Sequence, residues 1–194
     1  MRIIAGAFKG RTLKAPTWDG LRPTSDRLRE TLFNVLAPRV AGARVLDVCA
    51  GTGAVGLEAS SRGAAWVTFV ERDRRAVALI EDNLRTCRVS GDYTIDRRDA
   101  LAPAAAVAGG PFDIVFLDPP YTHASLDPWL EVAAAHVAPT GIVVLEHATR
   151  SGSSAQVAGL VRSRVLQQGD STLSFYVVSD SVTASRPASG AIDA

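Results

Sequence analysis

The sequence predicts a single α/β domain in which helices cover both faces of a largely parallel sheet. Strand-like runs alternate with helix-like segments from residue 44 onward, the runs are rich in Val, Ile, Leu and Phe, and 194 residues suit one domain. Apolar residues make up 47% of the chain and charged residues 21%, which is typical of a globular protein.

The residues that precede this alternation predict two further elements. In RIIAGAFKGRTLKAP, Gly6 and Gly10 are spaced like turn residues between short apolar pieces, which indicates a small hairpin. In RPTSDRLRETLFNVLAP, we expect either Thr24 or Ser25 to cap a helix that Pro38 ends.

From residue 44 the predicted strands and helices follow in order. Strands are expected at 44–48, 66–72, 93–100, 112–121 and 141–147. Helices are expected at 54–62, 73–87, 127–137 and 153–163. Two β-like runs within 164–179 predict an antiparallel hairpin at one sheet edge. The domain organisation is then a basic hairpin extension at 1–22, the main domain at 23–180 and a disordered tail at 181–194.

Composition argues against several classes of protein. No apolar run approaches the ~20 residues that span a bilayer, and the N-terminus lacks the apolar segment of a secretory signal, so we expect a cytoplasmic protein. Two cysteines, Cys49 and Cys87, and three histidines match no metal-ligand pattern, so neither a disulfide framework nor a metal is expected. We expect a monomer.

Positive charge gathers near the N-terminus. Residues 1–40 hold eight Lys and Arg against three Asp and Glu, a net charge of +5, whereas the whole chain has +1. Such a block is typical of a surface that meets a polyanion, although a charge run is as often simply solvated. The candidate RNA-binding residues are Arg2, Lys9, Arg11, Lys14, Arg22 and Arg27.

A glycine-rich loop follows the first strand of the alternation. Gly51, Gly53 and Gly56 form a G-x-G-x-x-G pattern, and Glu71 stands twenty residues past Gly51, as in dinucleotide-binding proteins, where the acid binds a ribose hydroxyl. Asp47 argues otherwise, because its charge would repel a pyrophosphate near the helix N-terminus. A cationic ligand without phosphates, such as S-adenosylmethionine, suits this loop better.

A third acid, Asp99, ends the 93–100 strand. Its carboxylate could accept a hydrogen bond from an adenine amino group, with the Ala100 N–H offered to the ring. Taken singly, the glycines could form an ordinary tight turn and the acids could be solvated strand ends. Three acids at successive strand ends beside one glycine loop favour a cofactor site, since ligands of open α/β sheets bind at that edge.

The run VFLDPPYTH ends an apolar strand with two prolines. Pro119 fixes its own φ and biases Asp118 toward an extended conformation, and Pro120 does the same to Pro119, which makes a stiff wall with fixed carbonyls. The exocyclic amine of a nucleobase is a poor nucleophile because its lone pair is delocalised. The Asp118 carboxylate and the Pro119 carbonyl are acceptors suited to gripping its hydrogens, and Tyr121 is a face on which an extruded base can stack. Alternatively, the prolines merely end the strand.

These motifs carry a family resemblance. LDVCAGTG and DPPY resemble the motifs of S-adenosylmethionine-dependent methyltransferases that act on base amino groups. With the two N-terminal stretches quoted above and GAVGLEASSRGA, residues 1 to about 180 closely resemble the bacterial RsmD family, the 16S ribosomal RNA guanine(966)-N2 methyltransferases. The resemblance implies a Rossmann-like seven-stranded S-adenosylmethionine-dependent methyltransferase sheet of order 3-2-1-4-5-7-6, with an N-terminal hairpin that helps to hold 16S rRNA of the small ribosomal subunit.

The candidate site residues follow from the motifs and the resemblance together. Catalysis is assigned to Asp118, Pro119, Pro120 and Tyr121. Cofactor binding is assigned to Asp47, Ala50, Gly51, Thr52, Gly53, Glu71, Arg72, Asp99, Ala100 and Asp118. Cys49 replaces the larger apolar or aromatic residue expected in the family and is expected only to pack.

Several nearby residues keep two interpretations. Arg22, Pro23 and Thr24 would shape the base pocket or cover the cofactor, and Thr24 is equally well explained as a cap. His123 could be a general base, although the amine proton can also leave to water. Glu146 lines the substrate mouth or is a solvated strand end. Trp129 and Leu130 are better explained as core or groove wall than as a stacking platform.

Other functions stay open at this stage. The same acceptor wall suits an adenine-N6 methyltransferase on DNA or RNA. The glycine pattern also allows a dinucleotide-dependent oxidoreductase, and the fold alone allows a non-catalytic nucleic-acid binding module.

Overall fold

A computed structural model of the chain describes residues 1–18, 24–102, 107–120 and 125–179. The helices are α1 (Asp26–Val40), α2 (Ala54–Ser61), α3 (Arg74–Cys87) and α4 (Asp127–His136). The strands are β1 (Arg44–Val48), β2 (Trp66–Val70), β3 (Tyr93–Asp96), β4 (Phe112–Leu117), β5 (Val137–Ala148), β6 (Gln156–Val157), β7 (Leu160–Gln168) and β8 (Ser171–Val178).

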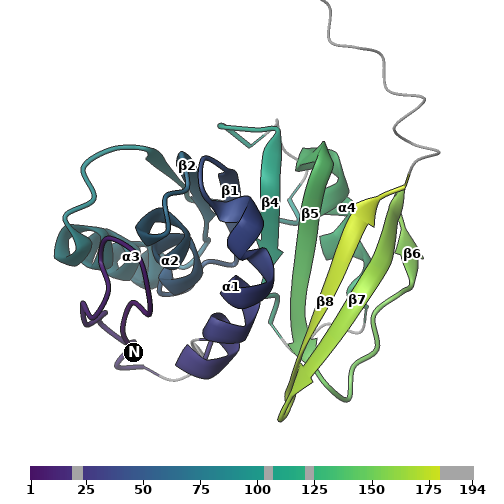
Figure 1. Ribbon diagram of the computed structural model, residues 1–194, viewed down its shortest axis with the longest axis horizontal. Coiled ribbons are helices and arrows are strands. Elements are labelled where there is room, and N and C mark those ends of the chain that lie inside the picture. The colour runs from purple at the N-terminus through teal and green to yellow at the C-terminus, as the bar shows by residue number, and fades with distance from the viewer. Residues whose placement is uncertain (19–23, 103–106, 121–124, 180–194) are drawn as a thin grey trace, which may run out of the picture.

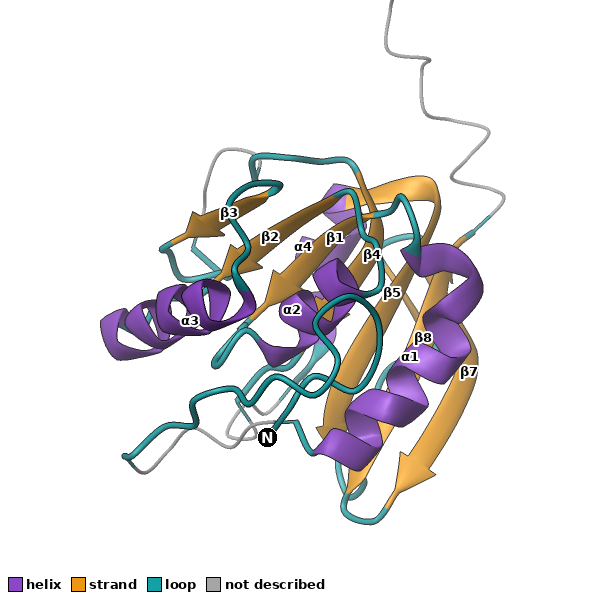
Figure 2. Cartoon of the chain, turned by 60° about the vertical axis from the view of Figure 1, so that its left-hand side comes forward, coloured by secondary structure: helices purple, strands orange, loops and turns teal. Residues whose placement is uncertain are grey.

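One sheet organises the molecule, with the order β3-β2-β1-β4-β5-β8-β7-β6. Strands β3 to β5 in this order are parallel, and β8, β7 and β6 continue the sheet antiparallel. Helices α1, α2 and α3 lie on one face and α4 lies on the other (Figures 1 and 2). The predicted α/β class and the antiparallel hairpin within 164–179 are confirmed, but β6 lies beyond this hairpin as the outermost strand.

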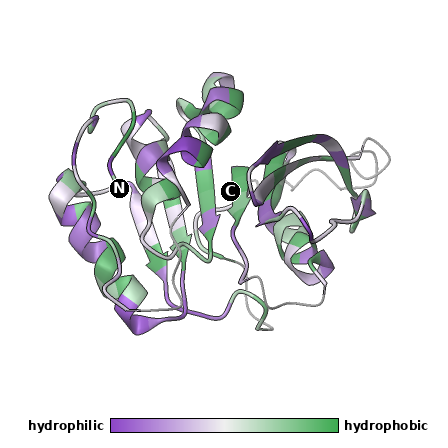
Figure 3. Cartoon of the chain, turned by 90° about the horizontal axis from the view of Figure 1, so that it is seen from below, coloured by the Kyte–Doolittle hydropathy of each residue, from purple (hydrophilic) through white to green (hydrophobic). Residues whose placement is uncertain are grey.

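Side chains that alternate along the strands fill two cores. Val45 faces the core shared with α1, α2 and α3, whereas Leu46 faces the core shared with α4. Trp129 and Leu130 of α4 are 3% and 0% exposed within that second core, so their prediction as core residues is confirmed. Figure 3 shows hydrophobic residues both in the strands and on parts of the helices.

The sheet has one strand more than predicted, because the helix expected at 153–163 is wrong. Residues of this segment form β6 and the start of β7. Ala158 and Gly159 between them have φ values of 49° and 81°, which is the backbone of a tight two-residue hairpin turn. Without β6, the order of the other seven strands is the predicted 3-2-1-4-5-7-6 with the last two strands renumbered.

Element ends differ from prediction in smaller ways. Ser25 is the cap of α1, and its Oγ accepts a hydrogen bond of 3.2 Å from the Leu28 N–H. Pro38 does not end α1, which continues to Val40, because a proline in the last turn removes only one hydrogen bond and Val40 gains burial at 1% exposure. Strand β5 begins at Val137, and β3 ends at Asp96 rather than near Asp99.

The N-terminal segment is a hairpin-like loop with one antiparallel bridge, Arg2 to Thr12, and no longer strands. Its anchor is Glu58 of α2, fully buried, which accepts from the N–H groups of Ile4 (2.8 Å) and Ala5 (3.0 Å). The buried Arg29 of α1 lies 3.7 Å from Glu58 and donates to the carbonyl of Arg2. These contacts fasten the segment to α1 and α2.

Candidate functional site

Four acidic side chains stand at the carboxyl ends of neighbouring parallel strands. Val48 of β1 is in register with Val70 of β2 and with Leu117 of β4, and Leu117 is in register with Leu145 of β5. The residues that follow Val70, Leu117 and Leu145 are Glu71, Asp118 and Glu146, and Asp47 immediately precedes Val48. The sheet therefore brings these acids to one edge, as parallel strands with a common register must.

The glycine loop turns over this edge, and two of the acids brace it. Cys49, Gly51 and Gly53 have φ values of 60°, 56° and 74°, so the loop reverses sharply between β1 and α2. Asp47 Oδ2 accepts from the Gly56 N–H at 2.9 Å, and Glu71 Oε2 accepts from the Gly51 N–H at 2.9 Å. The predicted loop residues Ala50, Gly51, Thr52 and Gly53 are all buried.

Asp47 is a buried carboxyl group with an unusual protonation equilibrium. Only 1% of the residue is exposed, and this burial raises its pKa to about 8, with a further contribution from Glu71, despite the hydrogen bond from Gly56. Among the residues that the structure describes, no cation pairs with Asp47. A cationic ligand at this edge would relieve the cost of ionising it.

The third predicted acid, Asp99, lies three residues beyond the end of β3 and forms an ion pair. Arg72 Nη1 lies 2.8 Å from Asp99 Oδ2, and the Arg72 side chain is exposed whereas that of Asp99 is partly buried. Asp99 Oδ1 accepts from the Leu101 N–H at 3.0 Å. The pair joins the loops after β2 and β3, so an adenine amino group would have to share the Asp99 carboxylate with Arg72.

Asp118 interacts electrostatically with Glu146, which in turn is hydrogen-bonded to Thr24. Burial raises the pKa of Asp118 well above its usual range, and the charges of Glu146 and Asp47 raise it further. Thr24 Oγ1 donates to Glu146 Oε2 at 3.1 Å, and both residues are buried. Glu146 is therefore not a solvated strand end, and Thr24 is not the helix cap.

Parts of the predicted site lie outside the described residues. These are Tyr121 of the catalytic motif, and Arg22, Pro23 and His123. Within the motif, Pro119 is buried and Pro120 is exposed.

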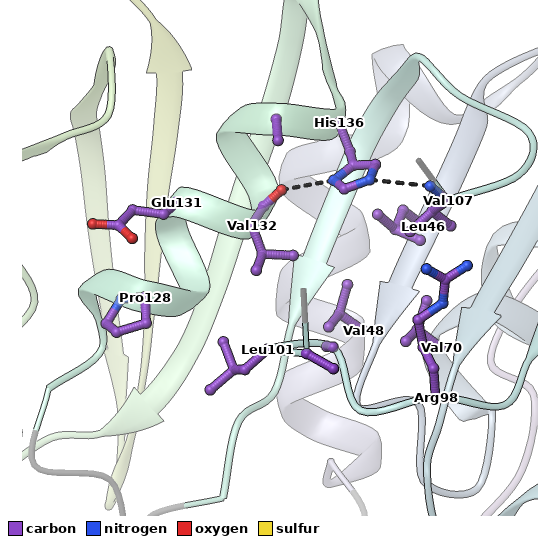
Figure 4. Close-up of a pocket in the computed structure, with 13 residues that line it drawn as sticks. Leu46, Val48, Val70, Arg98, Leu101, Val107, Pro128, Glu131, Val132 and His136 are labelled. Atoms are coloured by element: carbon purple, nitrogen blue, oxygen red, sulfur yellow. Dashed lines mark hydrogen bonds between the residues drawn. The ribbon is translucent and has the colours of Figure 1, made fainter. Parts of the chain in front are cut away.

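A separate, largely apolar pocket of about 350 Å³ opens on the α4 face (Figure 4). Leu46, Val48 and Val70 line it from the strands, and Ala100, which belongs to the predicted adenine contact, also lines it. His136 Nε2 accepts from the Val107 N–H at 3.1 Å, so Nδ1 carries the proton that is donated to the Val132 carbonyl at 2.8 Å. His136 thus has a structural role beside this pocket.

The predicted RNA-binding cations differ in their surroundings. Arg2, Lys9 and Arg27 are exposed. Arg11 Nη1 donates to the Thr86 carbonyl at 3.4 Å, and Lys14 Nζ lies 2.9 Å from Asp82. Lys14 is therefore partly neutralised by its neighbour.

Across the four described ranges, no three His, Cys, Asp or Glu side chains are grouped as metal ligands, and both cysteines are free thiols. No helix in the described part of the chain is long and apolar enough to cross a bilayer.

The structure contains polar contacts that the motifs did not reveal. Glu58 is the clearest, because its carboxylate receives two backbone N–H groups and lies 2.8 Å from Arg62. The signal was present in the sequence as the one charged residue of the otherwise apolar and small-residue helix AVGLEASS. Trp18, over which Arg75 lies, was also missed.

The third glycine of the loop supports a stability prediction. A Cβ on Gly56 would lie 2.3 Å from Phe69 Cε1 and 2.8 Å from Val67 Cγ1, both in the packed core. We expect Gly56→Ala to lower the free energy of unfolding by about 1–3 kcal/mol, measured by urea denaturation. Gly91→Ala is the control, since a Cβ there meets nothing within 4 Å; equal stability of both variants would contradict the close helix-to-strand packing.

Comparisons with known proteins cover nearly the whole chain. Residues 1–177 match the family model described as "Conserved hypothetical protein 95". The chain is 36% identical over 180 residues to "Putative rRNA methyltransferase YlbH" of Bacillus subtilis, covering 91% of this chain and 98% of that protein. It is 46% identical over 127 residues to "Ribosomal RNA small subunit methyltransferase D" of Escherichia coli strain K12, covering 66% of this chain and 63% of that protein. The solved structure "Putative methyltransferase yhhF from Escherichia coli" has a TM-score of 0.80 at 36% identity, covering 92% of this chain and 98% of that chain.

Proposed function

The chain belongs to the "Conserved hypothetical protein 95" family, which is the RsmD family of S-adenosylmethionine-dependent rRNA methyltransferases, and we propose that it methylates the exocyclic N2 of a guanine in 16S rRNA. The substrate would be this RNA within a small ribosomal subunit or an assembly intermediate. The observation that carries the proposal is the position of Asp118 and Pro119. These two residues directly follow β4 and lie between the glycine loop and Glu146, at the sheet edge where the four acids meet.

The residues at this edge fit S-adenosylmethionine, which carries an ammonium and a sulfonium but no phosphate. Asp47 and Asp118 are carboxyl groups whose pKa values are raised by burial, and a nearby positive charge favours their ionised forms. Glu71 already accepts from Gly51 and Asp73, and its remaining lone pairs suit ribose hydroxyls. When bound, the cofactor supplies an electrophilic methyl group.

Asp118 and Pro119 would activate the target amine by position rather than by covalent chemistry. The ionised Asp118 carboxylate and the Pro119 carbonyl accept the two amine hydrogens, which turns the nitrogen lone pair out of conjugation with the ring. The proline pair keeps both acceptors in fixed orientation. Because these acceptors are set before the base arrives, no reorganisation is needed at the moment of transfer.

The proposed RNA partner gives a prediction about salt dependence. Arg2 is exposed and has no acidic partner among the described residues, whereas Lys14 lies 2.9 Å from Asp82. We expect Arg2→Gln to flatten the slope of log affinity against log salt by roughly 0.7–0.9 and Lys14→Gln by less, measured by filter binding of 16S rRNA fragments. Arg39→Gln, at the far end of α1, is the control. Equal slopes for all three variants would count against an N-terminal RNA surface.

One experiment tests the function directly. Small subunits that lack the modification are incubated with the protein and methyl-labelled S-adenosylmethionine, and the labelled nucleotide is mapped and identified. N2-methylguanine in 16S rRNA supports the proposal. N6-methyladenine would instead favour the adenine-N6 alternative, and binding without any transfer would favour a non-catalytic RNA-binding module.

A further inference from the structure

Trp18 lies outside both hydrophobic cores and packs against a charged side chain. The side chain is half-buried, yet it is not among the residues packed on either core. Its ring instead lies against Arg75 of α3, whose guanidinium carbon is 4.9 Å from the ring centroid. A tryptophan normally contributes most by burying its large apolar surface, so this placement suggests a role other than core packing.

Arg75 is held in place by a short chain of hydrogen bonds that leads to the candidate site. Its guanidinium donates to Asp73 at 2.9 and 3.3 Å, and its backbone N–H donates to the same carboxylate at 2.8 Å. The Asp73 N–H in turn donates to Glu71 Oε1 at 2.9 Å. The partner of Trp18 is thus connected through Asp73 to the acid that braces the glycine loop.

The segment that leads to Trp18 runs along α3 from the C-terminal end of the helix toward its N-terminal end. Arg11 contacts the carbonyl of Thr86 near the C-terminal end of α3, and the Lys14 N–H donates to Asn83 Oδ1 at 2.7 Å. Trp18 then reaches the first turn of α3. That turn follows β2 directly, so the indole is brought to the carboxyl edge of the sheet, where Asp118 also lies.

We infer that Trp18, backed by Arg75, is a stacking platform for an unpaired nucleotide next to the methylated base. The inference rests on the proposed function, because it requires an RNA substrate. Every base has a π-face and stacks on an aromatic ring with little sequence preference, and a cation beside the ring adds to the interaction. In a duplex both faces of a base are already stacked, so the platform suits single-stranded RNA around an extruded guanine.

The chain offers a matched control for this platform. Trp66 at the start of β2 also lies against an arginine, with the Arg44 guanidinium carbon 5.7 Å from its ring centroid. This pair stands at the opposite, amino end of the strands. A substitution there removes a comparable arginine–indole contact without touching the carboxyl edge.

The test compares Trp18→Leu, Trp18→Phe and Trp66→Leu in binding to a labelled RNA hairpin with an unpaired guanine in its loop. We expect Trp18→Leu to weaken hairpin binding by roughly 5- to 100-fold, and Trp18→Phe to restore most of it. Trp66→Leu should bind as the wild type does. RNA should quench tryptophan fluorescence in the wild type and in Trp66→Leu, but not in Trp18→Leu.

Two outcomes would overturn the inference. One is unchanged hairpin affinity in Trp18→Leu. The other is weaker binding of S-adenosylhomocysteine by Trp18→Leu without RNA, which would place the indole over the cofactor instead. A wild-type protein that binds the hairpin but methylates no rRNA would remove the proposed function, and the hairpin comparison would still decide whether Trp18 is a platform.

Discussion

Asp118→Ala is expected to lower the rate of methyl transfer by about 100- to 1000-fold while RNA still binds. This factor is the one typical of losing a single preorganised electrostatic contact to a reacting group. Asp118 lies near Glu146 at the sheet edge where the four acids meet, and its backbone N–H donates to the Val48 carbonyl at 3.2 Å. Removing the carboxylate therefore deletes an acceptor without releasing the strand end that carries it. Single-turnover methylation of 16S rRNA measures the loss, and filter binding measures RNA retention.

Two variants separate this catalytic role from a structural one. Asp118→Asn keeps an oxygen that can accept one amine hydrogen but loses the negative charge, so it should be less active than the wild type yet more active than Asp118→Ala. Asp113→Ala removes the same residue type from the other end of β4, where Asp113 accepts from the Arg44 N–H at 2.8 Å. It should cost stability but leave transfer per folded molecule unchanged. Activity of Asp118→Ala within a few-fold of the wild type would remove the amine-gripping role.

The sequence predicts the fold correctly where hydrophobic periodicity and strand composition agree. The prediction is wrong where a short turn lies within a segment that has helical periodicity. The strands β1, β2 and β4 are almost continuously buried and rich in apolar residues, as is typical of the central strands of a parallel sheet. Val157, Leu160 and Val161 have helix-like spacing, so the sequence predicts a helix at 153–163 where the chain forms β6 and the start of β7. Ala158 decides the outcome by adopting a positive φ, which few alanines do and no sequence pattern signals.

The sequence was sufficient to predict which acids lie together at the site, but not which residues form hydrogen bonds or ion pairs with them. Parallel strands necessarily gather Glu71, Asp118 and Glu146 at one edge once their register is equal. Sequence alone could not reveal that Arg72 pairs with Asp99 or that Thr24 donates to Glu146, because each contact joins segments distant along the chain. These contacts depend on the tertiary structure, and local motifs do not record them.

Binding of S-adenosylmethionine is expected to release protons and to strengthen from pH 6 to pH 8. The pKa of Asp47 is about 8 in the free protein, raised first by burial and then by Glu71, while the Gly56 N–H opposes the shift. A bound cation favours the carboxylate, so affinity should rise by up to about tenfold per pH unit for each proton released. Calorimetry in buffers of different ionisation enthalpy counts these protons. S-adenosylhomocysteine, which lacks the sulfonium charge, should release fewer.

Asp47→Asn should weaken cofactor binding and remove most of its pH dependence, yet stabilise the free protein. The amide oxygen can still accept from the Gly56 N–H, so the loop keeps its brace while the charge is lost. Because the folded-state pKa of Asp47 is raised, the native state binds more protons than the unfolded chain between pH 4 and 8. The stability linked to this proton is fully present below about pH 4. It is lost progressively as the pH rises from there through about 8.

The two effects of Asp47→Asn have opposite signs, which makes the experiment decisive about the role of the charge. Urea unfolding at pH 5 to 8 should show the variant gaining on the wild type by up to about 1.4 kcal/mol per pH unit, the limit for one proton. Because the charge of Asp47 also raises the pKa of Asp118, the difference between the two proteins includes this coupling as well as the proton on Asp47 itself. A variant that loses both stability and affinity would mean that Asp47 serves mainly to hold the loop. A variant that is more stable but binds the cofactor poorly would mean that the wild type retains a buried charge, at a cost in stability, for its ligand.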